Sequence, residues 1–538
     1  MDTVPDRRTF LRAVAAVAGA GLIEGCTRGG VPPPPNPTGT TPGAPTGTRP
    51  TGSPTTPGSG PPTAADWTAL ARGLDGRLVR PGDRDYDTAR LLYSPRYDRI
   101  RPAAVAYCAG SADVRECLAF AARHRVPVTA RSGGHGYTGA STGPGLVLDV
   151  TPLHAVTVDA ASGTATVGAG ARLIDVYAAL AGHGLTVPAG SCPTVGIAGL
   201  ALGGGVGVVS RAYGLTSDAI VGARVVTANG RVRDCGPDRD PDLFWATRGG
   251  GGGNVGVVTS FRFRTFPAPD LTLFSVRWSW SRAARVVDGW QRWAPSAPDP
   301  VWSTCKLLAG GGRSTPTVFA AGTFLGSEAG LRRLLDGLVV RVGADPVATS
   351  VRTLPYLEAM LAEAGCAGLT PDQCHLPWQA PGGRLARESL AAASHFIGRP
   401  VPAAGLAAIV RGVAARGALG GGGEGGISLD ALGGAVNRVA PADTAFVHRD
   451  AIALAQLTTT WTGAAGAAQV AAQQRWLTGF RDALAPYGNG EAYQNYLDPT
   501  LAGWQRAYYG RNYDRLVRVK AAYDPGGLLR APQGIPVA

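Results

Sequence analysis

The chain has 538 residues, of which 45% are hydrophobic and 17% charged, and its formal net charge is +13 at pH 7. That length and apolar content exclude a chain that is disordered throughout and favour two lobes with separate cores. The basic excess is arginine scattered along the sequence, with no basic run interleaved with aromatic residues. This pattern argues against nucleic-acid binding and indicates a solvated basic surface, which would favour anionic polymers or substrates.

The first 26 residues (1–26) have the form of an export signal. Arg7 and Arg8 precede an apolar run at 13–23 that is too short to span a bilayer as a mature helix. Paired arginines in this place resemble a twin-arginine signal, which exports proteins that have already folded. The run ends in a lipobox-like sequence at Cys26, whose lipidation would tether the protein to a membrane. The alternative is a cleaved signal with an incidental cysteine, so we expect an exported protein, either extracellular or anchored at the cell surface.

Residues 27–63 are dominated by Pro, Gly, Thr and Ser and are predicted to be a disordered linker, because they cannot bury enough apolar surface to fold. Beyond them, hydrophobic periodicity predicts short strands alternating with helices. The strands are expected at 103–108, 126–130, 146–150, 164–167, 224–228 and 255–263, and the helices at 111–125 and 173–183. Ser111 is expected to cap the first helix and Gly184 to end the second. The alternation predicts an α+β fold with mixed strand pairing.

The middle of the chain has weaker signals. Strands are expected at 271–280, 317–322 and 452–461, and a helix at 327–338. The glycine-rich stretch Gly417–Gly426 is expected to be a mobile loop. Four tryptophans would either line a sugar-stacking groove or take part in ordinary packing: Trp278, Trp280, Trp302 and Trp378.

Eight cysteines are present, and in an exported protein some of them should pair. Cys366 and Cys374 flank a Gly/Thr/Pro turn and are the first candidates, while Cys108 and Cys117 are weaker ones. The sequence has no set of Cys and His residues at metal-ligand spacing and no HExxH motif. We therefore expect no metal site.

Two glycine-rich loops carry the most information about chemistry. The first, 128–139, has Arg131 at its mouth and His135 inside, and the second, 188–207, places Cys192 among seven glycines and no charged residue. Such loops let the backbone lie against a large planar cofactor, with N–H groups turned toward its polar edge. A nicotinamide-type Rossmann unit fits poorly, because Gly203–Gly207 does not open directly from a strand and no acidic residue follows about twenty positions on to hold a ribose.

Both loops resemble those of the berberine-bridge-enzyme-like branch of the FAD-linked oxidases, in the vanillyl-alcohol-oxidase / p-cresol-methylhydroxylase (PCMH) superfamily. The matching sequences are Arg131-Ser-Gly-Gly-His135-Gly-Tyr137, Cys192-Pro-Thr-Val195-Gly196, Arg211-Ala-Tyr213-Gly-Leu-Thr-Ser-Asp218, Gly251-Gly-Gly-Asn254-Val-Gly256-Val-Val and Tyr493-Gln-Asn495-Tyr496-Leu-Asp498. The resemblance implies a two-lobed α+β, PCMH-type fold with an FAD-binding domain at 64–266. It also implies a substrate domain at 267–490, with an antiparallel sheet covered by helices, and a C-terminal segment at 491–538 that returns to the FAD domain.

The resemblance further implies one FAD held by two covalent bonds, from His135 to the 8α methyl carbon and from Cys192 to ring carbon 6. A thiolate can add to the electron-poor ring, and an imidazole can trap the methide formed at the methyl group. The alternatives are a polar loop histidine and a buried inert thiol. The other residues that the resemblance assigns to FAD are Arg131, Ser132, Gly133, Gly134, Gly136, Tyr137, Val195, Gly196, Gly199, Gly203, Gly207, Asn254, Val257 and Asn495. For any one glycine, a tight turn is an equally good explanation.

Three residues are expected to serve the reaction. Tyr496 matches a family tyrosine that acts as the base or orients the substrate, and Tyr493 is the alternative. Both are expected on a strand, three residues apart, so that their side chains point to opposite faces. A phenol must lose roughly three pKa units to act near neutrality, so cations or the flavin itself are expected nearby. Gln456 either resembles the family's active-site glutamine or is a strand residue facing solvent.

Two further positions bear on the chemistry. Val206 stands where many family oxidases carry a second tyrosine, which leaves the proton acceptor open, with Tyr137 as a substitute. Val195 matches the small residue that the family associates with oxygen access, which favours an oxidase that makes hydrogen peroxide.

Together these features predict an exported FAD-dependent oxidase that removes hydride from an alcohol or hemiacetal C–H, with O2 as the acceptor. A saccharide or oligosaccharide is the leading substrate class, because an exported enzyme meets such polymers. The alternatives are oxidative tailoring of a secondary metabolite and, from a different class, a non-catalytic flavin carrier or sensor.

Overall fold

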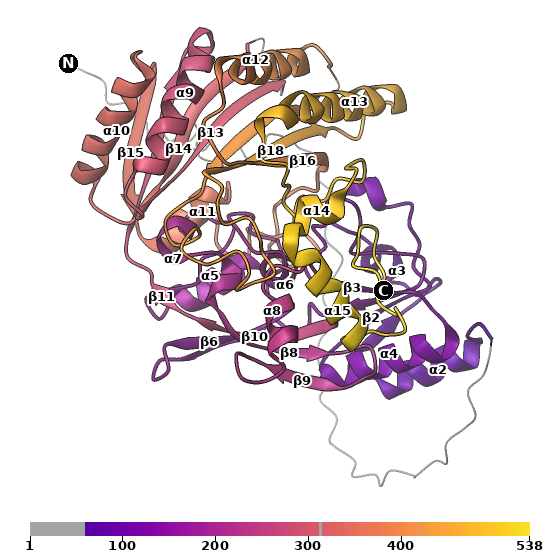
Figure 1. The fold of residues 1–538 in the computed structure, drawn as a ribbon. Coiled ribbons are helices and arrows are strands. Elements are labelled where there is room, and N and C mark those ends of the chain that lie inside the picture. Colours follow the sequence, from indigo (N-terminus) through magenta and orange to yellow (C-terminus); the bar gives the residue numbers. More distant parts are fainter. Residues whose placement is uncertain (1–59, 311–314, 421, 538) are drawn as a thin grey trace.

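The computed structural model describes residues 60–310, 315–420 and 422–537. The predicted export signal and residues 27–59 of the predicted linker lie outside these residues. None of the helices in the described ranges is both long enough and apolar enough to cross a membrane. The chain forms two lobes, a lower one in indigo and magenta and an upper one in red and orange (Figure 1).

The first sheet of the lower lobe has four strands in the order β1 (Arg77–Val79), β2 (Ala104–Tyr107), β4 (Leu146–Asp149) and β3 (Val128–Arg131). Strand β4 pairs in parallel with β2 and β3, and β1 is antiparallel to β2. Helices α2 (Ala64–Gly73) and α4 (Ser111–His124) lie beside this sheet (Figure 1). Strands β2, β3 and β4 and helix α4 confirm the predicted elements to within a few residues, and β1 was not predicted.

The prediction that Ser111 caps α4 is wrong. The N-cap is Gly110, and no side chain caps this helix. Ser111 is the first helical residue, and its Oγ lies 3.0 Å from Oγ1 of Thr259 in the second sheet. The hydroxyl therefore links helix α4 to the second sheet, which is a tertiary contact that helix-end statistics do not reveal.

The second sheet is antiparallel, in the order β5 (Val156–Asp159), β6 (Thr164–Gly168), β10 (Val257–Arg264), β8 (Ile220–Val226) and β9 (Val232–Cys235). Helix α5 (Leu173–Ala181) follows β6 and ends at Gly182 rather than at the predicted Gly184. Gly184 lies two residues further on, with φ of +68°, where it turns the chain into β7 (Leu185–Thr186).

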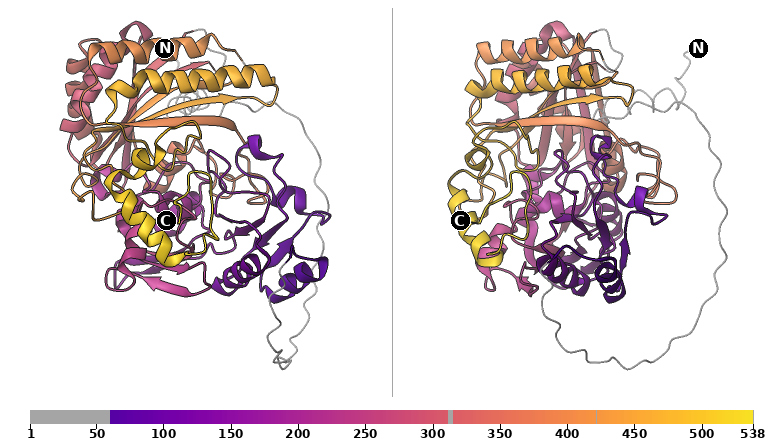
Figure 2. Two further views of the ribbon diagram at one scale, coloured as in Figure 1. Left: turned by 45° about the vertical axis from the view of Figure 1, so that its right-hand side comes forward. Right: turned by 90° about the vertical axis from the view of Figure 1, so that its right-hand side faces the viewer.

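The upper lobe is built on a seven-stranded antiparallel sheet. Its order is β15 (Ala348–Leu354), β12 (Leu271–Trp278), β14 (Thr317–Phe324), β13 (Val301–Gly310), β17 (Glu424–Ala431), β18 (Ala453–Trp461) and β16 (Ser389–Ile397). Helices α9 (Ala283–Trp293), α10 (Glu328–Val342), α12 (Ala403–Gly417) and α13 (Ala467–Leu484) cover one face, and the other face looks down on the lower lobe (Figures 1 and 2). The two-lobed fold with an antiparallel sheet covered by helices is confirmed.

Residue alternation explains why one face of this sheet is covered. Val276, Leu307, Ile427 and Leu457 are buried with the helices in one apolar core. The neighbouring positions on the same strands point the other way, because side chains alternate along a strand. The predicted glycine loop Gly417–Gly426 is shorter than expected, since Gly425 and Gly426 pair with β13.

The C-terminal segment leaves the upper lobe after α13 and runs down the lower lobe as α14 (Trp504–Tyr509) and α15 (Tyr513–Tyr523), drawn in yellow (Figure 2). Tyr493 and Tyr496 precede α14 in an irregular turn, where the Tyr496 N–H donates to the Tyr493 carbonyl at 2.8 Å. The predicted strand at this place is wrong. The turn brings the two rings into contact, with centroids 4.8 Å apart, instead of sending them to opposite faces.

The disulfide between Cys366 and Cys374 is confirmed, with Cα atoms 5.8 Å apart. Cys108 and Cys117 are both free and buried, so the weaker pairing is wrong. The Cys108 thiol lies 3.6 Å from the Ala106 carbonyl. Burial keeps both thiols inside the core between α4 and the first sheet.

Candidate active site

The two glycine loops meet through their glycines. A Cβ on Gly133 would lie 2.2 Å from the Gly196 nitrogen, and a Cβ on Gly196 would lie 2.2 Å from the Gly133 nitrogen. The backbones are therefore in direct contact, and no side chain fits between them. This contact brings His135 and Cys192, which are far apart in the sequence, into one site.

A cavity of about 260 Å3, here called the loop cavity, lies along these loops. Most of the residues predicted to hold FAD line it: Arg131, Ser132, Gly133, Gly134, His135, Gly136, Tyr137, Cys192, Val195, Gly196, Gly199, Asn254, Val257 and Asn495. Gly203 does not line the loop cavity; it packs against Asn495, because a Cβ there would lie 2.0 Å from Oδ1 of Asn495. Gly207 lines a second cavity, and a Cβ on it would lie 1.8 Å from the Ala189 carbonyl.

The loop cavity fits a dinucleotide cofactor. The N–H groups of residues 132–137 donate to no acceptor among the described residues, which leaves a row of donors for an anion. A Cβ on Gly199 or Gly253 would meet no atom within 4 Å, and both glycines line the cavity. Arg131 is mainly structural: its Nη2 donates to the Ala89 carbonyl at 2.6 Å and it pairs with Asp149.

The C-terminus closes the far end of the loop cavity, which residues 529–534 line. The Ile535 N–H donates to Asn254 Oδ1 at 3.0 Å, and the Asn254 amide donates to the Gly250 carbonyl at 2.8 Å. Lys520 Nζ donates to the Asn254 carbonyl at 2.8 Å. Asn254 therefore ties the fourth glycine motif to the end of the chain.

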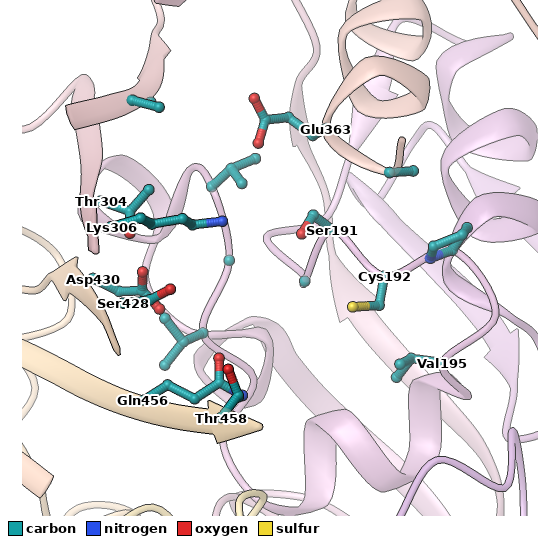
Figure 3. Close-up of a pocket in the computed structure, with 18 of the residues that line it drawn as sticks. Ser191, Cys192, Val195, Thr304, Lys306, Glu363, Ser428, Asp430, Gln456 and Thr458 are labelled. Atoms are coloured by element: carbon teal, nitrogen blue, oxygen red, sulfur yellow. The ribbon is translucent and has the colours of Figure 1, made fainter. Parts of the chain in front are cut away.

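A second cavity of about 290 Å3, here called the sheet cavity, lies under the open face of the seven-stranded sheet (Figure 3). Its wall consists of alternate residues on neighbouring strands, among them Trp302, Thr304, Lys306 and Leu308 on β13, Ser428 and Asp430 on β17, and Gln456 and Thr458 on β18. Strand register places Lys306 opposite Ser428 and Ser428 opposite Gln456, which makes one polar row across three strands.

The two cavities share six residues: His135, Tyr137, Cys192, Val195, Leu200 and Tyr496. Cys192 is exposed to this shared space, while the other free cysteines in the described ranges are buried. His135 stacks on Tyr93 with centroids 4.1 Å apart, and its Nε2 lies 2.8 Å from Thr194 Oγ1. Burial, assisted by the nearby Arg172, lowers the pKa of His135 to about 3, so the imidazole is neutral.

Tyr496 faces both cavities, whereas Tyr493 lines neither. The Tyr493 hydroxyl accepts hydrogen bonds from the Gly205 N–H at 2.8 Å, the Asn495 amide at 2.9 Å and the Val206 N–H at 3.3 Å. Its ring packs against that of Tyr496. Tyr493 therefore positions the second glycine-rich loop, at Gly205 and Val206, and the ring of Tyr496.

Tyr137, which was considered as a substitute for the second tyrosine that Val206 replaces, lies beside Tyr496. The two rings stack with centroids 5.5 Å apart, and Gln456 Nε2 donates to the Tyr137 hydroxyl at 3.1 Å. Gln456 thus lies in the sheet cavity and does not face bulk solvent. Val206 also lines this cavity.

The ionisable groups around Tyr496 differ from those expected. Burial raises the pKa of Tyr496 well above its usual value, and Tyr137 and Asp430 add to the effect. Burial also raises the pKa of Asp430, while Lys306 acts to lower it. Lys306 therefore acts on the carboxyl group of Asp430 and not on the phenol of Tyr496. In the protein without its cofactor, Tyr496 keeps its phenolic proton.

The sequence analysis missed the polar wall of the sheet cavity. Lys306, Ser428 and Asp430 come from two strands whose register the sequence does not reveal. Among the four tryptophans, Trp302 lines the cavity, while Trp278 is buried on the other face and donates to the Ala344 carbonyl at 2.9 Å. Trp280 packs against the apolar core between the seven-stranded sheet and its covering helices. Trp378 lies outside the sheet cavity, with 38% of its surface exposed. Within the described ranges, no three His, Cys, Asp or Glu side chains converge as metal ligands.

Comparison with known proteins agrees with this architecture. The family described as FAD binding domain matches residues 102–236, and the family described as berberine and berberine like matches residues 492–536. An FAD-linked oxidoreductase of Bacillus subtilis, YgaK, is 34% identical over 86% of this chain and 97% of its own length. A chitooligosaccharide oxidase of Gibberella zeae is 33% identical over 81% of this chain and 87% of its own.

Among solved structures, a xylooligosaccharide oxidase from Myceliophthora thermophila, in complex with xylobiose, superposes with a TM-score of 0.77. It is 28% identical and covers 88% of this chain and 100% of its own. Fold and site together define an FAD-dependent oxidoreductase. The chain belongs to the berberine-bridge-enzyme-like family of FAD-linked oxidoreductases.

Proposed function

We propose that the protein is an exported oxidase that oxidises an alcohol or hemiacetal carbon of a saccharide, with O2 as the electron acceptor. The observation that carries the proposal is the junction of the loop cavity with the polar sheet cavity at His135, Cys192 and Tyr496. The names of two relatives, a chitooligosaccharide oxidase and a xylooligosaccharide oxidase, support the substrate class. Export is supported by the twin-arginine-like sequence at Arg7 and Arg8.

His135 and Cys192 are proposed to attach FAD covalently. A neutral imidazole whose Nε2 is bonded to Thr194 has Nδ1 left as the nucleophile. Burial raises the pKa of the Cys192 thiol, and Lys306 acts in the opposite direction. When bound, FAD supplies the hydride acceptor and returns its electrons to O2, and Val195 at the junction is small enough to leave the oxygen path open.

Tyr496 is proposed to receive the substrate hydroxyl proton as the C–H hydride departs. Because its own pKa is raised, it must pass on its phenolic proton in the same event. Asp430 lines the same cavity and is proposed to accept that proton; burial raises its pKa, and Lys306 acts in the opposite direction. Tyr137 and Gln456 hold the Tyr496 ring and the substrate oxygen in place.

A peroxide-coupled screen tests the activity. Purified protein should be yellow, keep its colour after acid precipitation and lose it anaerobically on addition of a suitable oligosaccharide. Peptide mapping should place the flavin on the peptides that contain His135 and Cys192. Absence of flavin bleaching with every sugar and alcohol would contradict the oxidase, and flavin on other peptides would contradict the attachment.

A further inference from the structure

A third cavity, of about 650 Å3 and here called the outer cavity, lies beside the first glycine-rich loop. Residues 131–134 line both the outer cavity and the loop cavity, but none of the six residues shared by the loop and sheet cavities lines it. Segments of the lower lobe form most of its wall, and Trp378 and Gln379, from the segment between α11 (Tyr356–Glu363) and β16, complete it. The proposed oxidation therefore gives the outer cavity no role.

Arg172 lines the outer cavity and neither of the other two. Its guanidinium makes no hydrogen bond or ion pair with any residue that the structure describes, and its Nε is buried. Other arginines inside the protein are fully engaged, since Arg211 donates to three carbonyl groups and Arg449 pairs with Asp218 through both Nη atoms. Because buried donors without acceptors are unfavourable, Arg172 indicates an acceptor that does not come from the described part of the chain.

Two carboxyl groups act on Arg172, and both are paired elsewhere. Burial lowers the pKa of Arg172, and Asp175 and Asp149 act in the opposite direction. Asp175 pairs with His375 at 3.1 Å, and Asp149 pairs with Arg131. Neither carboxylate forms an ion pair with Arg172, so its charge is available to a ligand in the outer cavity.

The rest of the wall suits a ligand larger than a simple ion. Three aromatic residues line the outer cavity, Tyr93, Tyr107 and Trp378, and 38% of the surface of Trp378 is exposed. Asp75 and Gln379 add polar groups, and Asp75 is exposed to solvent. A cavity of this size has room for an oxyanion joined to a small organic group, whose apolar atoms the aromatic side chains would contact.

We propose that the outer cavity binds a phosphate group, with Arg172 as its anchor, and that its size favours a phosphate carried by a small organic molecule. A guanidinium matches two phosphate oxygens with two parallel N–H groups. The ring of Tyr93 stacks on His135 with centroids 4.1 Å apart, and residues 131–134 belong to the same loop as His135. A ligand in the outer cavity therefore stabilises the loop that carries His135, outside the space in which substrate is oxidised.

The test uses the flavin-loaded protein, because its cofactor keeps the probes out of the loop cavity. Inorganic phosphate and glycerol 3-phosphate are titrated separately, with sodium chloride at the same ionic strength as the reference. Binding is followed by calorimetry and by Tm. Each probe should raise the Tm of the wild type by about 1–3 °C near saturation, beyond the effect of chloride. Tighter binding of glycerol 3-phosphate would assign the site to an organic phosphate, and tighter binding of inorganic phosphate would assign it to the free ion.

Three variants locate the site. Arg172→Gln should weaken phosphate binding by about tenfold or more, because it removes the charged donor. Arg172→Lys keeps the charge but not the paired N–H groups, so it should weaken binding by about threefold to tenfold. Arg123→Gln is the matched control, since Arg123 is exposed on α4, lines none of the three cavities and carries the same charge. This control should bind phosphate as the wild type does.

Three outcomes would overturn the proposal. They are the absence of a phosphate-specific response in the wild type, equal binding by the wild type and the Arg172 variants, and binding to the flavin-free protein that disappears when flavin is loaded. The last would place the anion in the loop cavity. If Arg172→Gln does not fold, the wild-type titration and Arg172→Lys still decide the question. Each of these outcomes leaves the proposed oxidase function intact, because no measurement here depends on turnover.

Discussion

The loop cavity and the sheet cavity share six residues but are built by different means. The loop cavity is formed largely by backbone: glycines that allow close approach, N–H groups that have no acceptor in the described part of the chain, and the C-terminal residues 529–534. The sheet cavity is formed by side chains that alternate along strands of an antiparallel sheet. Backbone geometry restricts sequence strongly, whereas an outward strand position accepts many side chains. The loop cavity therefore restricts the sequence that forms it, whereas the sheet cavity restricts its sequence much less.

The largest expected effect tests whether Tyr496 and Tyr493 act differently. Tyr496→Phe should slow anaerobic flavin reduction by about 10²–10⁴-fold, because it removes the group that takes the substrate proton. Stopped-flow absorbance measures this rate, and the flavin content should not change. An unchanged reduction rate would exclude Tyr496 as the proton acceptor.

Tyr493→Phe is the matched control for that substitution. It leaves the donors of Gly205, Val206 and Asn495 without their acceptor, which should lower the free energy of unfolding by about 1–3 kcal/mol. The reduction rate should fall much less than in Tyr496→Phe. If the two variants lose the same rate, the division between a reacting and a positioning tyrosine is wrong.

Lys520→Met tests the C-terminal closure of the loop cavity. The substitution leaves Asp524 buried and unpaired and removes three hydrogen bonds, so the free energy of unfolding should fall by about 3–5 kcal/mol. Denaturant titration, followed by tryptophan fluorescence, measures it. Arg506→Met, which breaks an exposed ion pair with Asp514 in the same segment, should cost only about 0–1 kcal/mol. Similar losses in the two variants would show that the buried lysine is not what holds the segment.

Substitutions at two glycines of the second glycine-rich loop test whether each glycine is needed for backbone packing or for contact with the cofactor. In Gly196→Ala, the new Cβ would lie 2.1 Å from Ser132 Oγ and 2.2 Å from the Gly133 nitrogen, so the loops must separate at a cost of about 1–3 kcal/mol. In Gly199→Ala, within helix α6 (Ile197–Leu202), the Cβ meets no protein atom and enters the loop cavity. That variant should gain up to about 1 kcal/mol of helix stability and bind less flavin. Tm and flavin absorbance per chain measure the two effects, and full flavin content in Gly199→Ala would contradict the placement of the cofactor.

The same contrast explains what the sequence could reveal. Gly133 and Gly196 must be glycine because two backbones touch, so the loops keep a readable pattern, and the residues that line the loop cavity were largely predicted. Lys306, Ser428 and Gln456 become neighbours only through the register of β13, β17 and β18, which are far apart in the sequence. Gln456 was found through the family resemblance alone. The local sequence around Lys306 and Ser428 has no comparable signature.

The errors in the fold also come from tertiary contacts. Tyr493 and Tyr496 were expected on a strand, but the Tyr493 hydroxyl is held by Gly205 and Asn495, and this contact favours a turn. Ser111 has the chemistry of a cap, yet its hydroxyl meets Thr259 of the neighbouring sheet. Periodicity located the strands because it reports burial, and burial does not depend on which partner lies opposite.

The smallest expected effect is on how the free energy of unfolding depends on pH. It should have opposite signs for a carboxyl group in the sheet cavity and one on the lower lobe. Burial in the sheet cavity raises the pKa of Glu363 from 4.5 to about 7, against the effects of Lys306 and Arg352. Between these two values the folded state holds a proton that the unfolded state releases, so this group lowers stability as pH rises through that window. Glu363→Gln removes the group, and its free energy of unfolding relative to wild type should rise from pH 4.5 to pH 7 and then level off.

Asp234, on the outer strand β9 of the lower lobe, gives the opposite sign. The hydrogen bond from Arg224 holds its pKa below the usual value, so this ion pair stabilises the protein above the unfolded pKa and is lost as pH falls. Asp234→Asn should therefore be less stable than wild type at neutral pH, by a small amount because the pair is exposed, and equal to it in acid. Urea unfolding at pH 3, 4.5, 6 and 8 measures both variants, because the ordinary pKa of the Asp234 carboxyl is 3.8. A Glu363→Gln difference that is flat across these pH values would mean that Glu363 stays ionised in the folded protein, beside Lys306 and Arg352.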